Sequence, residues 1–172
     1  AVFSYPLAHN VECFGYKILF KKQKGSLDAN KLKELGIMPG PFYREIKEAD
    51  TFEFNGIVYN SSEFLSEDKP EKEISIIPDT RYFDGLGEFV KNSNIIISEC
   101  TYLLKEDAHH ARKNYHLSIL DIEKMIAQSK VESLFLTHIS ARYDRNIEKE
   151  AIESLHDKCN VKIAHDLEEY SL

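Results

Sequence analysis

Short apolar runs rich in β-branched residues alternate along the chain with segments in which apolar residues recur at three- and four-residue spacing. The first pattern predicts buried strands and the second predicts helices that pack against them. Together they indicate an α/β fold with helices layered on a sheet. The expected strands are 74–77, 94–98, 134–136 and 161–164, with an earlier one inside AVFSYPLA at the start of the sequence. The expected helices are 85–91, 117–129 and 146–155.

Three of these strands end at residues of metal-ligand type. His9 follows SYPLA, Asp79 follows ISIIP and His138 follows LFLT. Groups placed just past the carboxyl ends of strands meet along one edge of a sheet, where sites of α/β proteins are built. Imidazole nitrogens and carboxylate oxygens suit Zn²⁺ or Mn²⁺. A single histidine at a strand end is more often an ordinary surface residue, so the prediction depends on the three occurring together.

A second candidate pair consists of Glu99, at the end of the run NIIIS, and His116, in NYHLS. A histidine that faces a carboxylate near a helix start can act as a general acid. Ser118 and Asp121 would form a capping box for that helix, with Asp in place of the usual Glu or Gln. The alternative is a polar strand end and an unrelated loop histidine.

Arg142 lies four residues after His138, in the stretch LTHISARYDR. Its planar and permanently charged guanidinium suits a pair of phosphate oxygens. The alternative for Arg142 is a surface ion pair with Asp144 or Glu148, which is the commoner fate of an arginine.

The chain has 172 residues and a net charge of −7, which argues against a protein that coats nucleic acid by overall charge. Three scattered cysteines are too few for a disulfide framework and predict reduced thiols, as in cytoplasmic proteins. The sequence contains neither an apolar run long enough to span a membrane nor a secretory leader. We therefore expect a cytoplasmic protein without a membrane partner.

Charge is distributed unevenly along the first half of the chain. Residues 21–47 carry seven basic side chains against three acidic ones, whereas residues 48–73 carry eight acidic side chains against two basic ones. A basic segment inside an acidic protein indicates a local contact with a polyanion. A solvated insertion would show the same charges.

The order of the motifs resembles ribonuclease Z, a family of tRNA 3′-processing endonucleases within the metallo-β-lactamase superfamily. The matching motifs are YPLAHNVECFGYKI, GSLDANKLKELGIMPGPFYREIK, IIPDTR, IISECT, NYHLS and LTHISARY. The resemblance covers nearly the whole chain, and the last motif together with the glycine- and proline-containing segment is its most specific part.

This resemblance implies an αββα sandwich with two zinc ions, of which residues 1–172 would form the C-terminal half. It implies that His9 and His138 are metal ligands, that Asp79 bridges the metals, and that Glu99 and His116 donate a proton to the leaving 3′ oxygen. Arg142 would hold the scissile phosphate with Ser140 beside it. A flexible arm at about 21–50 would grip precursor tRNA, and its binding residues would be Lys31, Lys33, Arg44 and Lys47.

The sequence also departs from the family pattern. The His-x-His-x-Asp-His motif, which supplies most of the remaining metal ligands, is absent. Pro78, Cys100 and Leu117 replace residues that are usually small. His109 and His110 lie in a helical stretch and are expected to be solvated. Half a sandwich would expose an apolar sheet face, so we expect a homodimer or a pairing with a missing N-terminal half.

Three functions therefore remain open at this stage. The first is a zinc-dependent endonuclease to which this chain contributes part of the site. The second is a non-catalytic half that binds tRNA and needs a partner chain. The third is a hydrolase of small phosphodiesters from the same superfamily.

Overall fold

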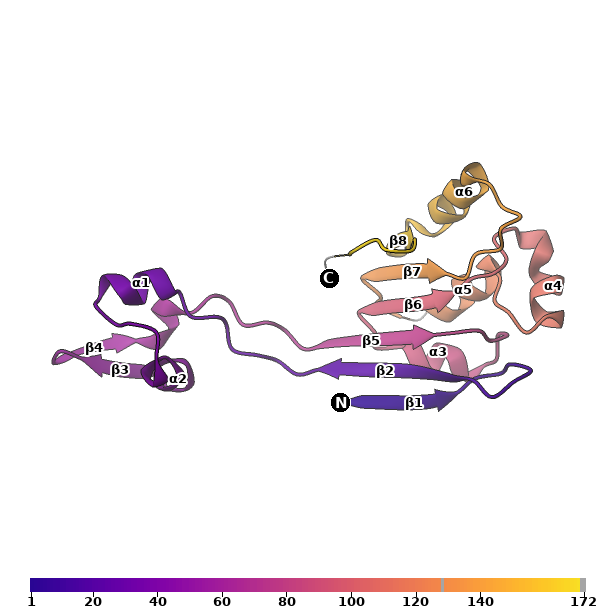
Figure 1. Ribbon diagram of the computed structural model, residues 1–172. Coiled ribbons are helices and arrows are strands. Elements are labelled where there is room, and N and C mark those ends of the chain that lie inside the picture. Colours follow the sequence, from indigo (N-terminus) through magenta and orange to yellow (C-terminus); the bar gives the residue numbers. More distant parts are fainter. Residues whose placement is uncertain (128, 171–172) are drawn as a thin grey trace. The chain divides into compact units, whose positions relative to one another are not determined.

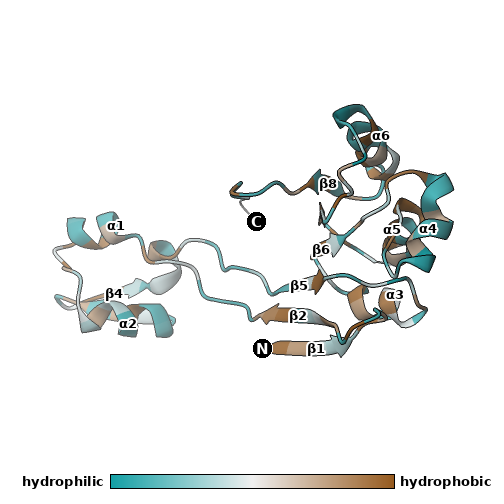
Figure 2. Cartoon of the chain, turned by 45° about the vertical axis from the view of Figure 1, so that its right-hand side comes forward, coloured by the Kyte–Doolittle hydropathy of each residue, from teal (hydrophilic) through white to brown (hydrophobic). Residues whose placement is uncertain are grey.

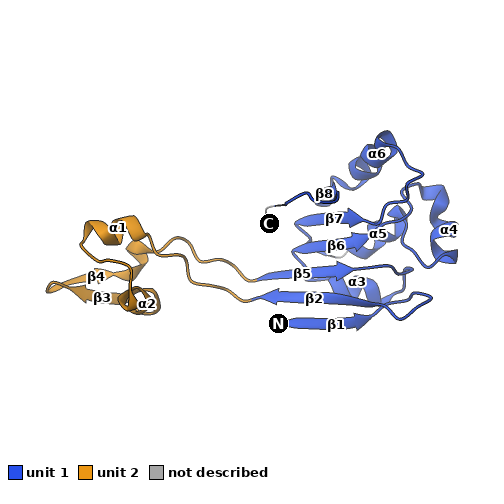
Figure 3. Ribbon diagram, viewed as in Figure 1, with its two compact units in different colours: residues 1–20, 72–172 blue, residues 21–71 orange. Residues whose placement is uncertain are grey.

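The computed structural model describes residues 1–127 and 129–170, which form two compact units. The first unit comprises Ala1–Phe20 and Lys72–Leu172, and the second comprises Lys21–Glu71 (Figure 3). The segment 21–50, predicted as an arm, falls inside the second unit, which continues to Glu71.

A six-stranded mixed sheet forms the centre of the first unit, in the order β1-β2-β5-β6-β7-β8 (Figure 1). β2 runs antiparallel to both β1 and β5, whereas β5, β6, β7 and β8 are parallel. β1 therefore points in the same direction as β5 to β8, so the carboxyl ends of five strands share one edge. The strands are β1 (Val2–Pro6), β2 (Phe14–Phe20), β5 (Lys72–Ile77), β6 (Ile95–Glu99), β7 (Ser133–Thr137) and β8 (Asn160–Ile163).

Helices cover one face of this sheet and form the main core with it. Ile77, Ile96 and Leu134 point from the sheet into a cluster with Leu86 and Ile122 of the helices, and all five are almost fully buried. The helical elements of this unit are α3 (Gly85–Val90), η2 (Lys105–Asp107), α4 (Ala108–Lys113), α5 (Ile119–Ile126) and α6 (Arg145–Leu155). The predicted layering of helices on a sheet is present.

The opposite face of the sheet is also apolar, but the described residues cover only part of it. Near β7, Tyr170 packs edge-on against Phe135, with ring centroids 5.0 Å apart. On β2, Phe14, Tyr16 and Phe20 remain 36%, 42% and 47% exposed. This strand is coloured largely as hydrophobic in Figure 2. Exposed aromatic side chains in a row on one strand are typical of a surface that binds another protein layer.

The second unit has a small core of its own around Leu32, Ile46 and Phe52. The unit also contains a tight hairpin, in which Asn55 and Gly56 both have positive φ, of 52° and 77°, as a two-residue turn requires. Its elements are α1 (Ala29–Glu34), α2 (Pro41–Glu48), β3 (Thr51–Phe54), β4 (Ile57–Asn60) and η1 (Ser61–Phe64).

The elements expected from sequence are present, with ends shifted by one to three residues. The expected helix 117–129 is α5, which begins after Ser118; position 128 lies outside the described residues. The capping box is present as expected, since both the backbone N and the Oγ of Ser118 bond to Asp121 Oδ2, at 3.0 and 2.6 Å. Sequence analysis missed β2 and the β3–β4 hairpin.

Candidate active site

The carboxyl edge of the sheet gathers the predicted site residues. His9 follows β1, Asp79 follows β5, Glu99 ends β6 and His138 follows β7. Two backbone contacts hold the first two loops together: Ala8 N donates to Thr80 Oγ1 at 3.0 Å, and Arg81 N donates to Ala8 O at 3.0 Å. The topology of the sheet therefore brings together groups that are far apart in the sequence.

Three imidazole rings lie next to one another at this edge. The ring centroids of His9 and His116 are 5.6 Å apart, and those of His116 and His138 are 5.1 Å apart. Asp79 Oδ1 lies 3.6 Å from His138 Nδ1. One ligand atom from each of His9, Asp79 and His116 falls within 4.8 Å of the others, and the same holds for Glu99, His116 and His138.

Glu99 is the buried centre of this cluster, with a side chain only 1% exposed. Its Oε1 accepts hydrogen bonds from Thr80 N and Leu117 N, both at 3.0 Å, and from His116 Nδ1 at 3.1 Å. Its Oε2 accepts from Thr101 N at 3.0 Å and from Thr101 Oγ1 at 2.9 Å. Burial raises the pKa of Glu99, while the hydrogen bonds from Thr80 and Thr101 and the charge of His116 oppose that shift.

The hydrogen bonds that Glu99 accepts determine which ring nitrogens of His116 and His138 remain free. Thr101 Oγ1 gives its proton to Glu99, so it accepts from His138 Nδ1 at 2.8 Å and leaves Nε2 of His138 available. In the same way His116 donates from Nδ1 to Glu99 and keeps Nε2 available. His138 adopts a left-handed backbone conformation with φ 55°, which costs free energy in a non-glycine residue and occurs often at functional sites.

These donors fit a zinc ion, although they are too few for two ions. The predicted ligands His9, Asp79 and His138 combine two imidazoles with one carboxylate that is 37% exposed, a common zinc donor set. Glu99 is a poor ligand because five hydrogen bonds already occupy its two oxygens. The structure does not bring the three predicted ligands together as one group: among the described residues, each set whose ligand atoms fall within 4.8 Å includes His116, either with His9 and Asp79 or with Glu99 and His138. A second ion would need ligands from elsewhere.

Arg142 lies beside the cluster and is held by aromatic rings rather than by the acids considered from sequence. Its guanidinium lies 5.1 Å from the ring centroid of Tyr102 and 5.8 Å from that of Tyr143. Its Nε donates to Ser140 Oγ at 3.2 Å. The proposed ion pairs with Asp144 or Glu148 are absent from the described residues; the acidic partner is Asp107, at 3.9 Å.

Tyr143 fixes the other side of this arrangement. Its hydroxyl donates to Asp107 Oδ2 at 2.6 Å. Burial, the acceptor bond and the charge of Asp107 raise the pKa of Tyr143 to about 12. Ser140 N also donates to Thr101 O at 3.2 Å, which ties the Arg142 loop to the strand end that carries Glu99.

The predicted substrate-binding residues of the basic segment belong to the second unit. Lys31 and Lys33 lie on α1, and Arg44 and Lys47 lie on α2. Arg44 forms an exposed ion pair with Glu48 at 2.9 Å, and Lys31 Nζ donates to a backbone oxygen at 3.0 Å. His109 and His110 are exposed on α4, as expected.

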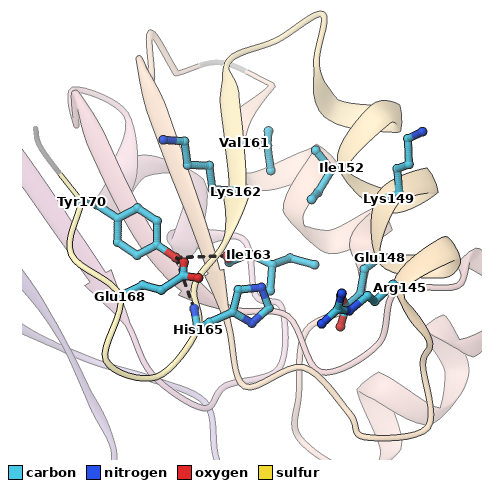
Figure 4. A pocket seen from close by; sticks show the side chains of 10 residues that line it. All are labelled: Arg145, Glu148, Lys149, Ile152, Val161, Lys162, Ile163, His165, Glu168 and Tyr170. Atoms are coloured by element: carbon cyan, nitrogen blue, oxygen red, sulfur yellow. Dashed lines mark hydrogen bonds between the residues drawn. The ribbon is translucent and has the colours of Figure 1, made fainter.

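A separate cavity of about 630 Å³ lies between α6 and β8. Figure 4 shows that its lining mixes charges of both signs, including Arg145, Glu148 and Lys162. Tyr170 OH already bonds to the carboxylate of Glu168 there. None of the predicted site residues lines this cavity, so the histidine cluster is the better candidate for chemistry.

Two positioning residues were missed by sequence analysis. Thr80 and Thr101 bind Glu99 directly, and Thr101 also orients His138. The sequence did contain a signal for them, because Thr80 follows the predicted metal ligand Asp79 and Thr101 follows the predicted acid Glu99 within two residues.

Comparison with known proteins identifies relatives of this chain. The chain is 32% identical over 166 residues to proteins named ribonuclease Z from Bacillus thuringiensis (strain Al Hakam) and Bacillus anthracis. The chain is similar to ribonuclease Z. The match covers 95% of this chain and 54% of each relative, so the chain spans about half the length of the ribonuclease Z proteins it matches. The resemblance predicted from the motifs is confirmed, and no family model matches the chain.

A solved structure confirms the fold class. The metallo-β-lactamase fold protein YhfI from Bacillus subtilis aligns with a TM-score of 0.53 and 15% identity, covering 94% of this chain and 46% of that one. The first unit thus has part of a metallo-β-lactamase sandwich. Human tRNase Z, short form, aligns over 94% of this chain and 40% of that chain with 14% identity and a TM-score of 0.48, too low to carry an argument about fold.

No helix in the described part of the chain has the length and apolar character needed to cross a membrane.

Proposed function

We propose that this chain forms part of an endoribonuclease that cleaves the 3′ trailer from precursor tRNA. The observation that carries the proposal is the convergence of His9, Asp79, His116 and His138 around the buried Glu99. The similarity to ribonuclease Z supports the substrate class. The cytoplasm is the expected location.

The residues of this chain divide into three roles. The resemblance assigns metal binding to His9, Asp79 and His138, and zinc held there would supply positive charge that lowers the pKa of water and neutralises phosphate oxygens. Glu99 holds His116 through Nδ1, so a protonated His116 has a proton at Nε2 to give to the leaving 3′ oxygen. Arg142 adds a fixed positive charge for the phosphate, and its stacking against Tyr102 limits its motion.

The small number of ligands supports a site completed by other residues. Three metal ligands do not hold two ions tightly, and the chain spans 54% of the length of its relatives. The exposed aromatic residues of β2 offer a surface on which further structure can pack. We propose that a second β-sheet, from the same protein or from another copy, covers this face and supplies the missing ligands.

The principal experiment combines zinc binding with cleavage. Zinc affinity is measured by competition with a chromophoric chelator, and cleavage is measured on a precursor tRNA with a short 3′ trailer. His138→Ala should weaken zinc binding at least tenfold and abolish cleavage, because it removes a ligand. His165→Ala is the matched control, since His165 is an exposed histidine beyond β8. Undiminished zinc binding and cleavage by His138→Ala would contradict the proposal.

A non-catalytic tRNA-binding role remains the alternative, because the basic segment lies in a unit with its own core. It predicts precursor binding without cleavage under conditions where zinc is bound. A hydrolase of small phosphodiesters predicts instead that deletion of 25–47 leaves turnover intact, whereas tRNA processing would collapse.

A further inference from the structure

A second arginine lies at the carboxyl edge of the sheet, after β5, whereas Arg142 follows β7. Arg81 comes two residues after Asp79, is exposed, and stacks over the ring of Tyr115 with its Cζ 4.8 Å from the ring centroid. No acidic side chain among the described residues forms an ion pair with Arg81. Its charge is therefore available to an anion from outside.

Tyr115 holds this arginine next to the site. Its backbone has φ 62°, an unfavourable conformation for an aromatic residue. Its ring also contacts His9 edge-on, with centroids 6.3 Å apart, and His116 is the next residue in the chain. Tyr115 thus contacts the candidate ligand His9, lies next to His116 in the chain and stacks on Arg81. A strained backbone at such a place is best explained by a role of Tyr115 in positioning these side chains.

The two stacked arginines follow different strands of the same sheet edge. Arg81 follows β5 and Arg142 follows β7, and Glu99 on the strand between them separates the two. Adjacent strands are about 4.8 Å apart, so the exits of β5 and β7 lie roughly 10 Å from each other. Each guanidinium is held on a different ring, Arg81 on Tyr115 and Arg142 on Tyr102, so the two charges offer separate positions for successive phosphates of a polynucleotide chain.

We propose that Arg81 binds the phosphate next to the scissile one in a single-stranded stretch of RNA, and that Tyr115 positions its guanidinium. This inference rests on the proposed function and adds a specificity residue to it. RNA would cross the rim with one phosphate at Arg142 and its neighbour at Arg81. Arg81 would then favour polynucleotides over substrates that carry only one phosphodiester.

The test measures binding of a fluorescein-labelled single-stranded RNA octamer by anisotropy, at a series of KCl concentrations, without added metal. A short single strand is used because it does not need the second unit for recognition of tRNA shape. Arg81→Gln should weaken binding about tenfold at low salt. It should also reduce the slope of log K against log [KCl] by about 0.7, the value for one lost phosphate contact on a single strand.

Control variants separate this role from a general charge effect. Lys158→Gln removes an exposed positive charge just after α6, at the opposite edge of the sheet, and should leave the slope unchanged. Tyr115→Leu should weaken binding with the charge still present, and Tyr115→Phe should restore wild-type affinity because it keeps the ring. Urea midpoints for each variant establish that folding is intact.

The outcomes distinguish this inference from the proposed function. An unchanged slope and affinity for Arg81→Gln, in a chain that binds the octamer, would overturn the inference alone. A wild-type chain that does not bind the octamer would overturn the inference, while zinc binding and precursor cleavage would still decide the proposed function. A reduced slope for Arg81→Gln would support the inference even if precursor tRNA is never cleaved, in which case only the catalytic proposal fails.

Discussion

Replacement of Glu99 gives the sharpest test of how the site is built. The carboxylate is 1% exposed and satisfies three backbone N–H groups, those of Thr80, Thr101 and Leu117. Thr80 and Leu117 are themselves fully buried, so neither amide has access to bulk water once its acceptor is removed.

The expected loss of stability follows from the number of orphaned donors. Each buried N–H without a partner costs about 1–3 kcal/mol, so two of them give about 2–6 kcal/mol. Removal of the buried carboxylate also removes the desolvation cost that raises the pKa of Glu99, and this offsets part of the loss. The net decrease in the free energy of unfolding for Glu99→Ala is therefore about 3 kcal/mol. Glu99→Gln keeps one acceptor oxygen and orphans only Thr101 N–H, so its loss should be about 1–2 kcal/mol.

Urea unfolding followed by circular dichroism, with EDTA present, measures both losses. With a slope of about 2 kcal/mol per molar urea, Glu99→Ala should lower the midpoint by about 1.5 M, and Glu99→Gln by less than 1 M. Glu106→Ala, at an exposed acid of η2, is the control and should stay within about 0.5 kcal/mol of the original chain. If Glu99→Ala unfolds at the same urea concentration as Glu106→Ala, the carboxylate does not organise the site and our reasoning is wrong.

Two further predictions concern alkaline pH and the exposed sheet face. Because the pKa of Tyr143 is raised to about 12 from 10.0, the folded state keeps a proton that the unfolded state loses, and the free energy of unfolding should fall as pH rises from 10 to 12. Tyr143→Phe should reduce that fall in urea unfolding, and an identical pH dependence would contradict the assignment. Tyr16→Lys should reduce self-association in sedimentation velocity experiments, since Tyr16 is 42% exposed on the uncovered face; unchanged sedimentation would argue against this face as a contact surface.

The convergence of the site was predictable because it depends on strand direction alone. Polar residues placed after apolar runs identified His9, Asp79, Glu99 and His138, and a parallel arrangement brings such ends to one edge. The hydrogen bonds of Thr101 were not predictable, because they depend on side-chain orientations that no periodicity records.

Three strands were not predicted from the sequence, for different physical reasons. The β3–β4 hairpin carries an Asn-Gly turn signal at Asn55 and Gly56, but its strands have only four residues each and are mostly exposed, so their apolar pattern is weak. β2 has aromatic residues on an exposed face, so its sequence FGYKILF lacks the alternation of a strand with one solvated polar face.

The way the second unit is inserted has a consequence for how such proteins can vary. Its two ends join β2 and β5, which are neighbouring antiparallel strands, and Phe20 pairs directly with Lys72. Paired residues of this kind have Cα atoms about 5 Å apart, a gap that a two-residue turn can close. The 51 residues from Lys21 to Glu71 could thus be exchanged for a tight turn or a different appendage, leaving the sheet register undisturbed. The appendage and the sheet that carries the histidine cluster can therefore change independently of each other.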